Sequence, residues 1–261
     1  MDDIDVIEAY VDGGLGIMSA SLSLVNPAFG MIAIGAQPML AKSIKNCLKK
    51  MVGNGITNRE YARLDKALDG MSDSIEENLK EKLTLNSNVL QKNGDGFTDA
   101  DDLFEEMLKQ IKNESESKKS YFCGIFIGNI PYSGNLSCSN LMQYEKIISQ
   151  LSYSQLCLLR ALSISKETGV NNCGGADNYV RTNPSPDILE VYSELLFLKS
   201  LGLLRKIPPY SLNSELGRVE ISEFGINLCK LMRLHLLDEA DVSKVYSLIE
   251  QFHVDKDKIF V

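Results

Sequence analysis

Cysteine and histidine are the residue types in this sequence that are best suited to metal binding or nucleophilic catalysis. The chain of 261 residues contains six cysteines and two histidines, His235 and His253. No two cysteines form a CxxC pair, and neither histidine has a cysteine at the spacing that zinc sites use. A Ser-His or Cys-His pair would have to use one of these histidines, and the pattern RLHLL predicts that His235 lies along a packed helix. We therefore expect no catalytic residue, no metal ligand and no cofactor.

The cysteines are better explained as free thiols. Cys157 and Cys229 fall inside apolar helical patterns, where a free cysteine behaves as a small hydrophobic residue. Asp2, Asp3 and Asp5 stand where a secretory signal peptide carries positive charge. Reduced thiols in a cytoplasmic protein are therefore the expectation.

Oxygen ligands for calcium are suggested faintly by the acidic stretch near Gly96. If Gly96 were the sixth residue of a calcium loop, Gln91 would be the first and Asp102 the twelfth, where a bidentate Glu is expected. The pattern fails at both positions, and Thr98 is better explained as the cap of a helix with an acidic first turn. Residues 167–184 are rich in Gly, Asn and Asp but lack the strand, helix and lysine of a phosphate-binding loop, so a surface loop is predicted there.

Composition limits the class of protein. The chain is 44% hydrophobic and 24% charged, which is typical of a globular protein with a substantial core. Its net charge of −8 argues against a main affinity for nucleic-acid phosphates, because such binding scales with the Lys and Arg residues that displace counterions.

Residues 13–41 form a run without a single charged residue. Pro27 and Pro38 divide it into pieces of about a dozen residues, each spanning roughly 18 Å as a helix, whereas a bilayer core needs about 30 Å. Buried helices are therefore predicted, while packing in an oligomer or partner interface and conditional membrane insertion stay open. The residues expected to make such oligomer or membrane contacts are Leu15, Ile17, Leu22, Leu24, Phe29 and Ile32.

Residues 42–51, KSIKNCLKKM, form a basic stretch with four lysines. The favoured interpretation is a solvated helical face, with contact to anionic lipid or nucleic acid as the alternative.

The middle of the chain predicts a helical bundle. Apolar residues recur at steps of three and four from Tyr61 to Leu79 and again over residues 99–129, where a kink near residues 113–117 is allowed. Residues 85–97 are expected to be a polar linker, and a further helix is expected over residues 140–149. Capping residues are expected at Thr57 with Glu60, at Thr98, and at Ser152 with Gln155.

The stretch from residue 185 to residue 236 organises the C-terminal part of the chain. Pro186 is expected to open an amphipathic helix, and Gly202 is expected to close it in the left-handed conformation. A short strand follows, and after a loop a second strand from Arg218 leads to Ser222, which can cap another helix. Helix, strand, loop, strand and helix in this order are typical of a winged helix. A last amphipathic helix is expected over residues 238–252.

The expected fold class is therefore mainly α, a helical bundle followed by a winged-helix-like domain with a small β-hairpin. The predicted domains are an apolar N-terminal helical segment (1–55), a long-helix bundle (56–150) and the winged-helix-like domain (151–261).

Several segments over residues 56–237 resemble an uncharacterised bacterial family. They are ITNREYARLDKAL, the stretch from DADDLFEEM to FIGNI, QLSYSQLCLLRALS, LEVYSELLFLKSLGLLRK and GRVEISEFGINLCKLM. The chain is also similar, more distantly, to abortive-infection proteins of the Abi-alpha type. The resemblance implies a helical region joined to a winged helix in a bacterial protein of phage defence or of a mobile element, and it does not cover the uncharged N-terminal run.

Three functions follow as expectations. The favoured one is a non-enzymatic, cytoplasmic interaction protein of bacterial phage defence that binds a protein partner or forms a homo-oligomer. The alternatives are a DNA-binding regulator and a membrane-perturbing effector that uses residues 13–41. DNA binding is disfavoured because the helix expected to enter the major groove carries Asp187, Glu190 and Glu194. The basic residues that would contact nucleic acid are Lys199, Arg205, Lys206 and Arg218.

Overall fold

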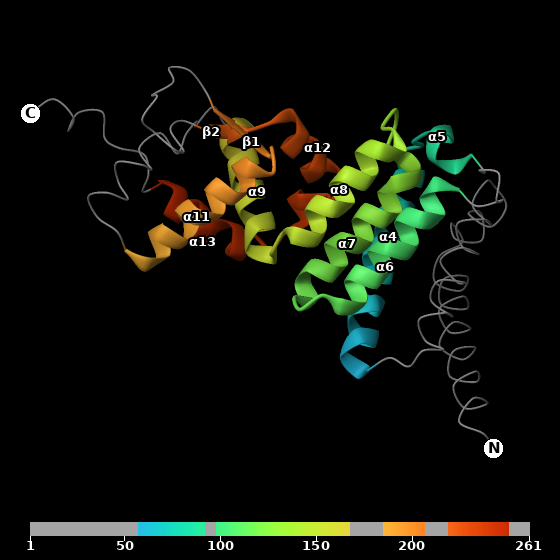
Figure 1. The fold of residues 1–261 in the computed structure, drawn as a ribbon, viewed down its shortest axis with the longest axis horizontal. Coiled ribbons are helices and arrows are strands. Elements are labelled where there is room, and N and C mark those ends of the chain that lie inside the picture. The colour runs from blue at the N-terminus through green and yellow to red at the C-terminus, as the bar shows by residue number, and fades with distance from the viewer. Residues whose placement is uncertain (1–56, 92–97, 168–184, 207–218, 251–261) are drawn as a thin grey trace, which may run out of the picture. The chain divides into compact units, whose positions relative to one another are not determined.

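The computed structural model in Figure 1 describes residues 57–91, 98–167, 185–206 and 219–250. Over these residues the protein is mainly helical, with one small antiparallel sheet of two strands. The chain divides into two compact units, Met1–Ser149 and Gln150–Val261. No helix in the described ranges is long and apolar enough to cross a membrane, and residues 13–41 lie outside those ranges.

The first unit consists of helices. In chain order they are α4 (Asn58–Lys80), α5 (Ser87–Leu90), α6 (Asp99–Asn113), α7 (Ser117–Asn129), the 3-10 helix η1 (Ile130–Tyr132) and α8 (Cys138–Gln150). The stretch predicted as a polar linker contains α5, because Asn86 caps the backbone N–H of Asn88 and Val89 is fully buried.

Local capping sets where these helices begin. The Thr57 hydroxyl accepts the N–H of Glu60, whose carboxylate accepts the N–H of Thr57 at 2.6 Å. Thr98 and Asp101 make the same reciprocal pair at the start of α6. The predicted caps at Thr57 and Thr98 are confirmed, since each satisfies backbone donors that the first turn of a helix leaves unpaired.

The apolar pattern over residues 99–129 forms two separate helices. Glu114 has an extended backbone (ψ 137°) that ends α6, and α7 begins three residues later. The Glu114 carboxylate accepts the N–H of Ser115 at 2.7 Å and that of Glu116 at 3.1 Å, so the chain reverses through a turn in the region where only a kink was expected.

Helices α4 and α7 pack closely against each other (Figure 1). A Cβ added to Gly124 would collide with the carbonyl oxygen of Ala67, and one added to Gly70 would collide with that of Tyr121. At Gly128 the added Cβ would lie 2.7 Å from the carbonyl oxygen of Met71. Glycine is therefore required at this crossing for close approach.

A small polar cluster closes one end of the α4–α7 contact. Asn129 Oδ1 accepts hydrogen bonds from Ser74 Oγ at 2.8 Å and from Asn78 Nδ2 at 2.7 Å. All three residues are buried, and their mutual bonds offset the cost of removing them from water.

The second unit contains the sheet and five helical segments among its described residues. In chain order the elements are α9 (Tyr153–Glu167), α11 (Pro186–Ser200), β1 (Leu204–Lys206), β2 (Val219–Ile221), α12 (Glu223–Leu231), the 3-10 helix η2 (Leu234–Leu236) and α13 (Glu239–Glu250). Ser152 and Gln155 make the predicted capping box before α9. Helix α9 is the centre of the core, with Leu156, Leu158 and Leu159 fully buried.

Helix α11 begins and ends as the sequence predicts. Ser185 caps it, Pro186 occupies its first turn, and Gly202 follows its end with φ +75°. The N–H of Gly202 donates to the carbonyl of Lys199 and the N–H of Leu203 to that of Leu198, which is the hydrogen-bond pair of a Schellman motif. The chain then enters β1 directly.

Strands β1 and β2 pair antiparallel, with Leu204 opposite Ile221 and Arg205 opposite Glu220. Ser222 links Gly202, just after the end of α11, to the first turn of α12. Its hydroxyl donates to the carbonyl of Gly202 at 2.8 Å and accepts the N–H of Gly225 at 3.0 Å, so the end of α11 is tied to the start of α12. The predicted cap at Ser222 is confirmed.

Candidate functional site

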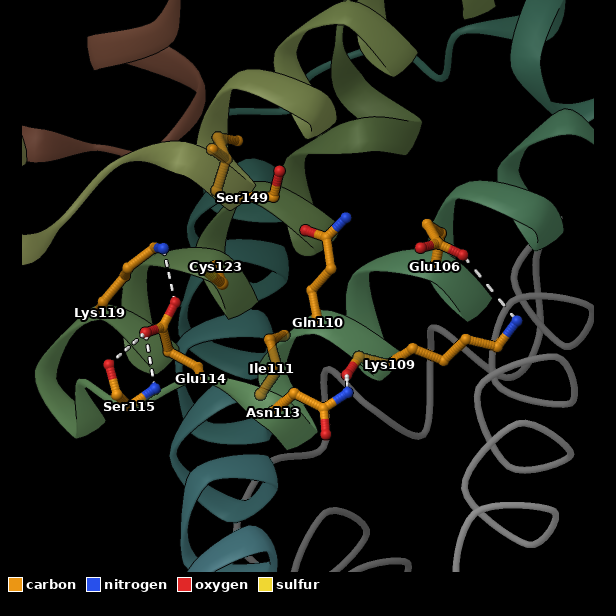
Figure 2. Close-up of a pocket in the computed structure, with 11 residues that line it drawn as sticks. Glu106, Lys109, Gln110, Ile111, Asn113, Glu114, Ser115, Lys119, Cys123 and Ser149 are labelled. Atoms are coloured by element: carbon orange, nitrogen blue, oxygen red, sulfur yellow. Dashed lines mark hydrogen bonds and ion pairs between the residues drawn. The ribbon is translucent and has the colours of Figure 1, made fainter. Parts of the chain in front are cut away.

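A hollow of about 360 Å³ opens in the first unit between α6, the start of α7 and the end of α8 (Figure 2). Polar side chains dominate its rim, while Ile111, Cys123 and Ile148 contribute apolar or weakly polar surface. The polar residues that line it are Glu106, Lys109, Gln110, Asn113, Glu114, Ser115, Lys119 and Ser149.

An ion pair occupies one side of the hollow. Lys119 Nζ lies 2.5 Å from Glu114 Oε2, and only 3% of the lysine side chain and 16% of the glutamate side chain are exposed (Figure 2). Burial raises the pKa of Glu114, but hydrogen bonds from Lys119 and from backbone N–H groups, together with the lysine charge, leave the pKa below its ordinary value. The carboxylate therefore stays ionised and neutralises Lys119.

The thiol beside this pair is not activated. Cys123 lies one helical turn after Lys119, and burial raises the pKa of Cys123 to about 12 even though the lysine charge opposes the shift. The thiolate is the nucleophilic form of cysteine, so this thiol is inert at neutral pH.

A buried carboxyl lies near the other side of the hollow. Glu145 of α8 is 5% exposed and is contacted by the Gln110 amide of α6. Burial raises the pKa of Glu145, the hydrogen bond from Gln110 opposes the shift, and the charge of Glu106 adds to it. Gln110 Oε1 is buried without a hydrogen-bond partner.

The charged groups in and beside the hollow are therefore mostly paired with one another, and few are left to bind or react with a ligand. Within the described residues, no three His, Cys, Asp or Glu side chains are grouped to hold a metal ion. Sequence reasoning did not find this hollow, because it depends on how α6, α7 and α8 meet. The one local signal was the second lysine of SKKSYF, which precedes an apolar run and is buried.

Among the described residues that were expected to contact nucleic acid, Arg205 is already paired with an acidic side chain. Arg205 Nε donates to Glu220 Oε1 at 2.6 Å, and Glu220 is the residue directly opposite Arg205 in the β1–β2 hairpin. Lys199 lies at the end of α11 and Lys206 in β1, both half-buried, and Arg218 lies outside the described residues. So do the expected oligomer or membrane contacts: Leu15, Ile17, Leu22, Leu24, Phe29 and Ile32.

The structure differs from the prediction made for His235. It is exposed in the short 3-10 helix η2, whereas a packed α-helix was predicted. The helix ends earlier because Arg233 adopts a left-handed backbone (φ 47°), which the apolar pattern RLHLL does not reveal. His253 lies outside the described residues.

The outer face of α11 is the second candidate surface, and its residues are apolar. Leu189 is 41% exposed, and Leu196 and Phe197 are half-buried, although Ile188, Val191, Leu195 and Leu198 already fix the opposite face in the core. We call Leu189, Leu196 and Phe197 the α11 outer face. Exposed Asp187 and Glu190 stand beside it.

No family model, no curated protein and no solved structure matches this chain.

Proposed function

We propose that this protein acts by protein–protein contact and that the α11 outer face, in a winged-helix-like second unit, is the contacting surface. The observation that carries the proposal is that α11, besides its buried apolar face, carries the exposed Leu189 and the half-buried Leu196 and Phe197 on its other side. One face is needed for the core, and the second exposes Leu189 with no structural requirement for a large aliphatic side chain. Contiguous apolar surface on a protein is a common site for binding another protein, which is why we choose these neighbouring residues as the contact.

The winged-helix assignment is supported by the order of the elements. Helix α11 is followed directly by the β1–β2 hairpin, and α12 follows the hairpin. In a winged helix that binds DNA, the helix before the hairpin meets phosphates and base edges, which favours Arg and Lys. Here Asp187 and Glu190 are exposed on that helix and Arg205 is bound to Glu220, so protein contact is the better use of this surface.

The proposal keeps a bacterial phage-defence setting without enzymatic activity, and that setting rests only on the resemblance of the five segments quoted above, of which SYSQLCLL and SLGLL are the most specific parts. The uncharged run 13–41, which lies outside the described residues, is retained in the proposal as a second contact for a homo-oligomer.

Self-association of the full chain provides the test. Sedimentation velocity over a concentration series should show association in the wild type and a clear loss of it in Leu189→Asp. Leu83→Asp is the matched control, because Leu83 is 43% exposed and lies in the first unit. Both variants should keep wild-type circular dichroism. A wild-type chain that stays monomeric at every concentration, or a Leu189→Asp variant that associates like wild type, would refute the proposal.

Gel-shift measurements address the DNA alternative. The expected result is no sequence-selective shift at moderate salt. Tight selective binding that is lost in Arg205→Ala would overturn the choice of protein contact over DNA contact.

A further inference from the structure

The hollow between α6, α7 and α8 has the size of a small-molecule site. Its volume of about 360 Å³ lies in the range that such sites occupy, and Ile111 and Ile148 give it apolar wall. All of its lining residues belong to the first unit and to the described ranges. Because most of its polar groups are paired with one another, a ligand has to be recognised by the hydrogen-bonding capacity that these pairs leave unused.

One unused group is an acceptor. Gln110 Oε1 is buried and accepts no hydrogen bond from the described residues, although the amide N–H of the same side chain donates to Glu145. Buried oxygens nearly always have a partner, so this one is available to a donor from a ligand. Gln110 lines the hollow, and the terminal torsion of a glutamine side chain is soft, so a small rotation presents the oxygen to a molecule bound there.

The second unused group is a donor. Lys119 is buried, and Glu114 is the one acceptor of its ammonium group among the described residues. An ammonium group can donate more hydrogen bonds than this one. In Figure 2, Lys119 and Gln110 reach the hollow from two sides, with Cys123 between them. A ligand that fills the hollow can therefore accept a hydrogen bond on one side and donate one on the other.

The charges that line the hollow cancel. Its lining contains two acidic and two basic side chains: Glu106, Glu114, Lys109 and Lys119. Glu145, which accepts from the Gln110 amide, is not part of the lining. An ionised ligand would therefore leave water without a counter-charge of its own, which costs more than its hydrogen bonds return. An uncharged ligand avoids that cost.

We propose that this hollow binds an uncharged small molecule of the carboxamide class. Its carbonyl oxygen accepts a hydrogen bond from the Lys119 ammonium, an N–H group donates to Gln110 Oε1, and its apolar part lies against Ile111 and Ile148. This site is separate from the α11 outer face and adds a ligand to the protein contact proposed above.

Titration of the full chain, labelled with ¹⁵N, with 3-aminobenzamide tests the proposal. This probe is uncharged at neutral pH and carries a carbonyl acceptor and N–H donors. Two-dimensional NMR should show saturable shifts of the backbone amide signals of Cys123 and Ser149, which line the hollow. The analogues 3-aminobenzoate and 3-aminobenzamidine have the same skeleton with a negative and a positive charge. Each should bind at least about tenfold more weakly, because its charge would be buried without a partner.

Two variants remove the recognising groups in turn. Gln110→Met keeps the length of the side chain and should weaken the binding of 3-aminobenzamide at least about threefold, because a thioether is a poor acceptor. Glu114→Gln with Lys119→Met removes the donor together with its counter-charge and should weaken binding by a similar factor. Gln143→Met is the matched control, since Gln143 is exposed on α8 and does not line the hollow. Far-UV circular dichroism verifies that each variant is folded.

The outcomes separate clearly. Saturable binding of 3-aminobenzamide in the wild type and in Gln143→Met, weakened in both hollow variants, supports the proposal. The absence of saturable shifts at the lining residues overturns it, and so does a charged analogue that binds as tightly as 3-aminobenzamide. A Gln110→Met variant, or a Glu114→Gln, Lys119→Met variant, that binds like wild type also overturns it. None of these results bears on self-association through the α11 outer face, so the proposed function stands or fails separately.

Discussion

Replacing Gly124 by alanine tests how the first unit is held together. The added methyl would meet the backbone carbonyl of Ala67 on α4, which has no rotamer to change, so α4 and α7 must move apart. Alanine is better than glycine in a helix interior by about 1 kcal/mol, and overpacking against an unyielding neighbour costs about 3 kcal/mol. The net expectation is a loss of about 2 kcal/mol in the free energy of unfolding.

Urea denaturation followed by far-UV circular dichroism measures this loss. Gly128→Ala should lose less than Gly124→Ala, because its added Cβ would be 2.7 Å from the Met71 carbonyl oxygen and so needs a smaller displacement. Ala62→Gly, at an exposed position of α4, measures the propensity difference without any packing change. A Gly124→Ala protein as stable as wild type would refute the reasoning, because alanine would then fit where the backbones are said to leave no room.

Three further predictions concern charge and backbone. Glu114→Gln should destabilise the first unit by roughly 3 kcal/mol because it leaves Lys119 buried without a counter-charge, and Lys119→Met should restore part of the loss in the double variant. Because the pKa of Glu114 is lowered, its contribution is present above the unfolded pKa and is lost as pH falls through the folded pKa, which denaturation between pH 6 and pH 3 will show. The pKa of Glu145 is raised, so its ionisation costs stability as pH rises; Glu145→Gln should have a higher urea midpoint than wild type at pH 7 and an equal one at pH 4. Lys82→Gly should gain about 0.5–1 kcal/mol because Lys82 follows the C-terminal end of α4 with φ 54°, whereas Gly202→Ala should lose about 1 kcal/mol because Gly202 has φ +75°; thermal unfolding measures both.

Features that depend on a few neighbouring residues could be predicted from the sequence. The caps at Thr57, Ser152 and Ser222 are set by side chains that bond backbone groups within three residues, and each forms as expected. The end of α11 at Gly202 was predictable for the same reason, since only glycine adopts that conformation at low cost.

Features that depend on tertiary contact could not be predicted. At the turn between α6 and α7 the Glu114 carboxylate accepts the N–H groups of Ser115 and Glu116 and pairs with the buried Lys119, and the apolar period of residues 99–129 does not indicate this turn. The hollow beside it needs three helices to meet. The α11 outer face was hidden for a different reason. From the sequence alone, all the apolar residues of α11 are predicted to lie in the core. Only the burial of the opposite side of the helix shows that Leu189 is not part of that core.

The buried thiols give each unit its own kinetic reporter. Cys123 belongs to the first unit, Cys157 and Cys229 belong to the second, and all three are buried thiols that form no disulfide. A thiol reagent can modify them only after the surrounding helices open. The labelling rate of Cys123 therefore measures how often the first unit opens, and the labelling rates of Cys157 and Cys229 measure how often the second unit opens. Mass spectrometry of one labelled sample would therefore rank the opening rates of both units without any engineered probe.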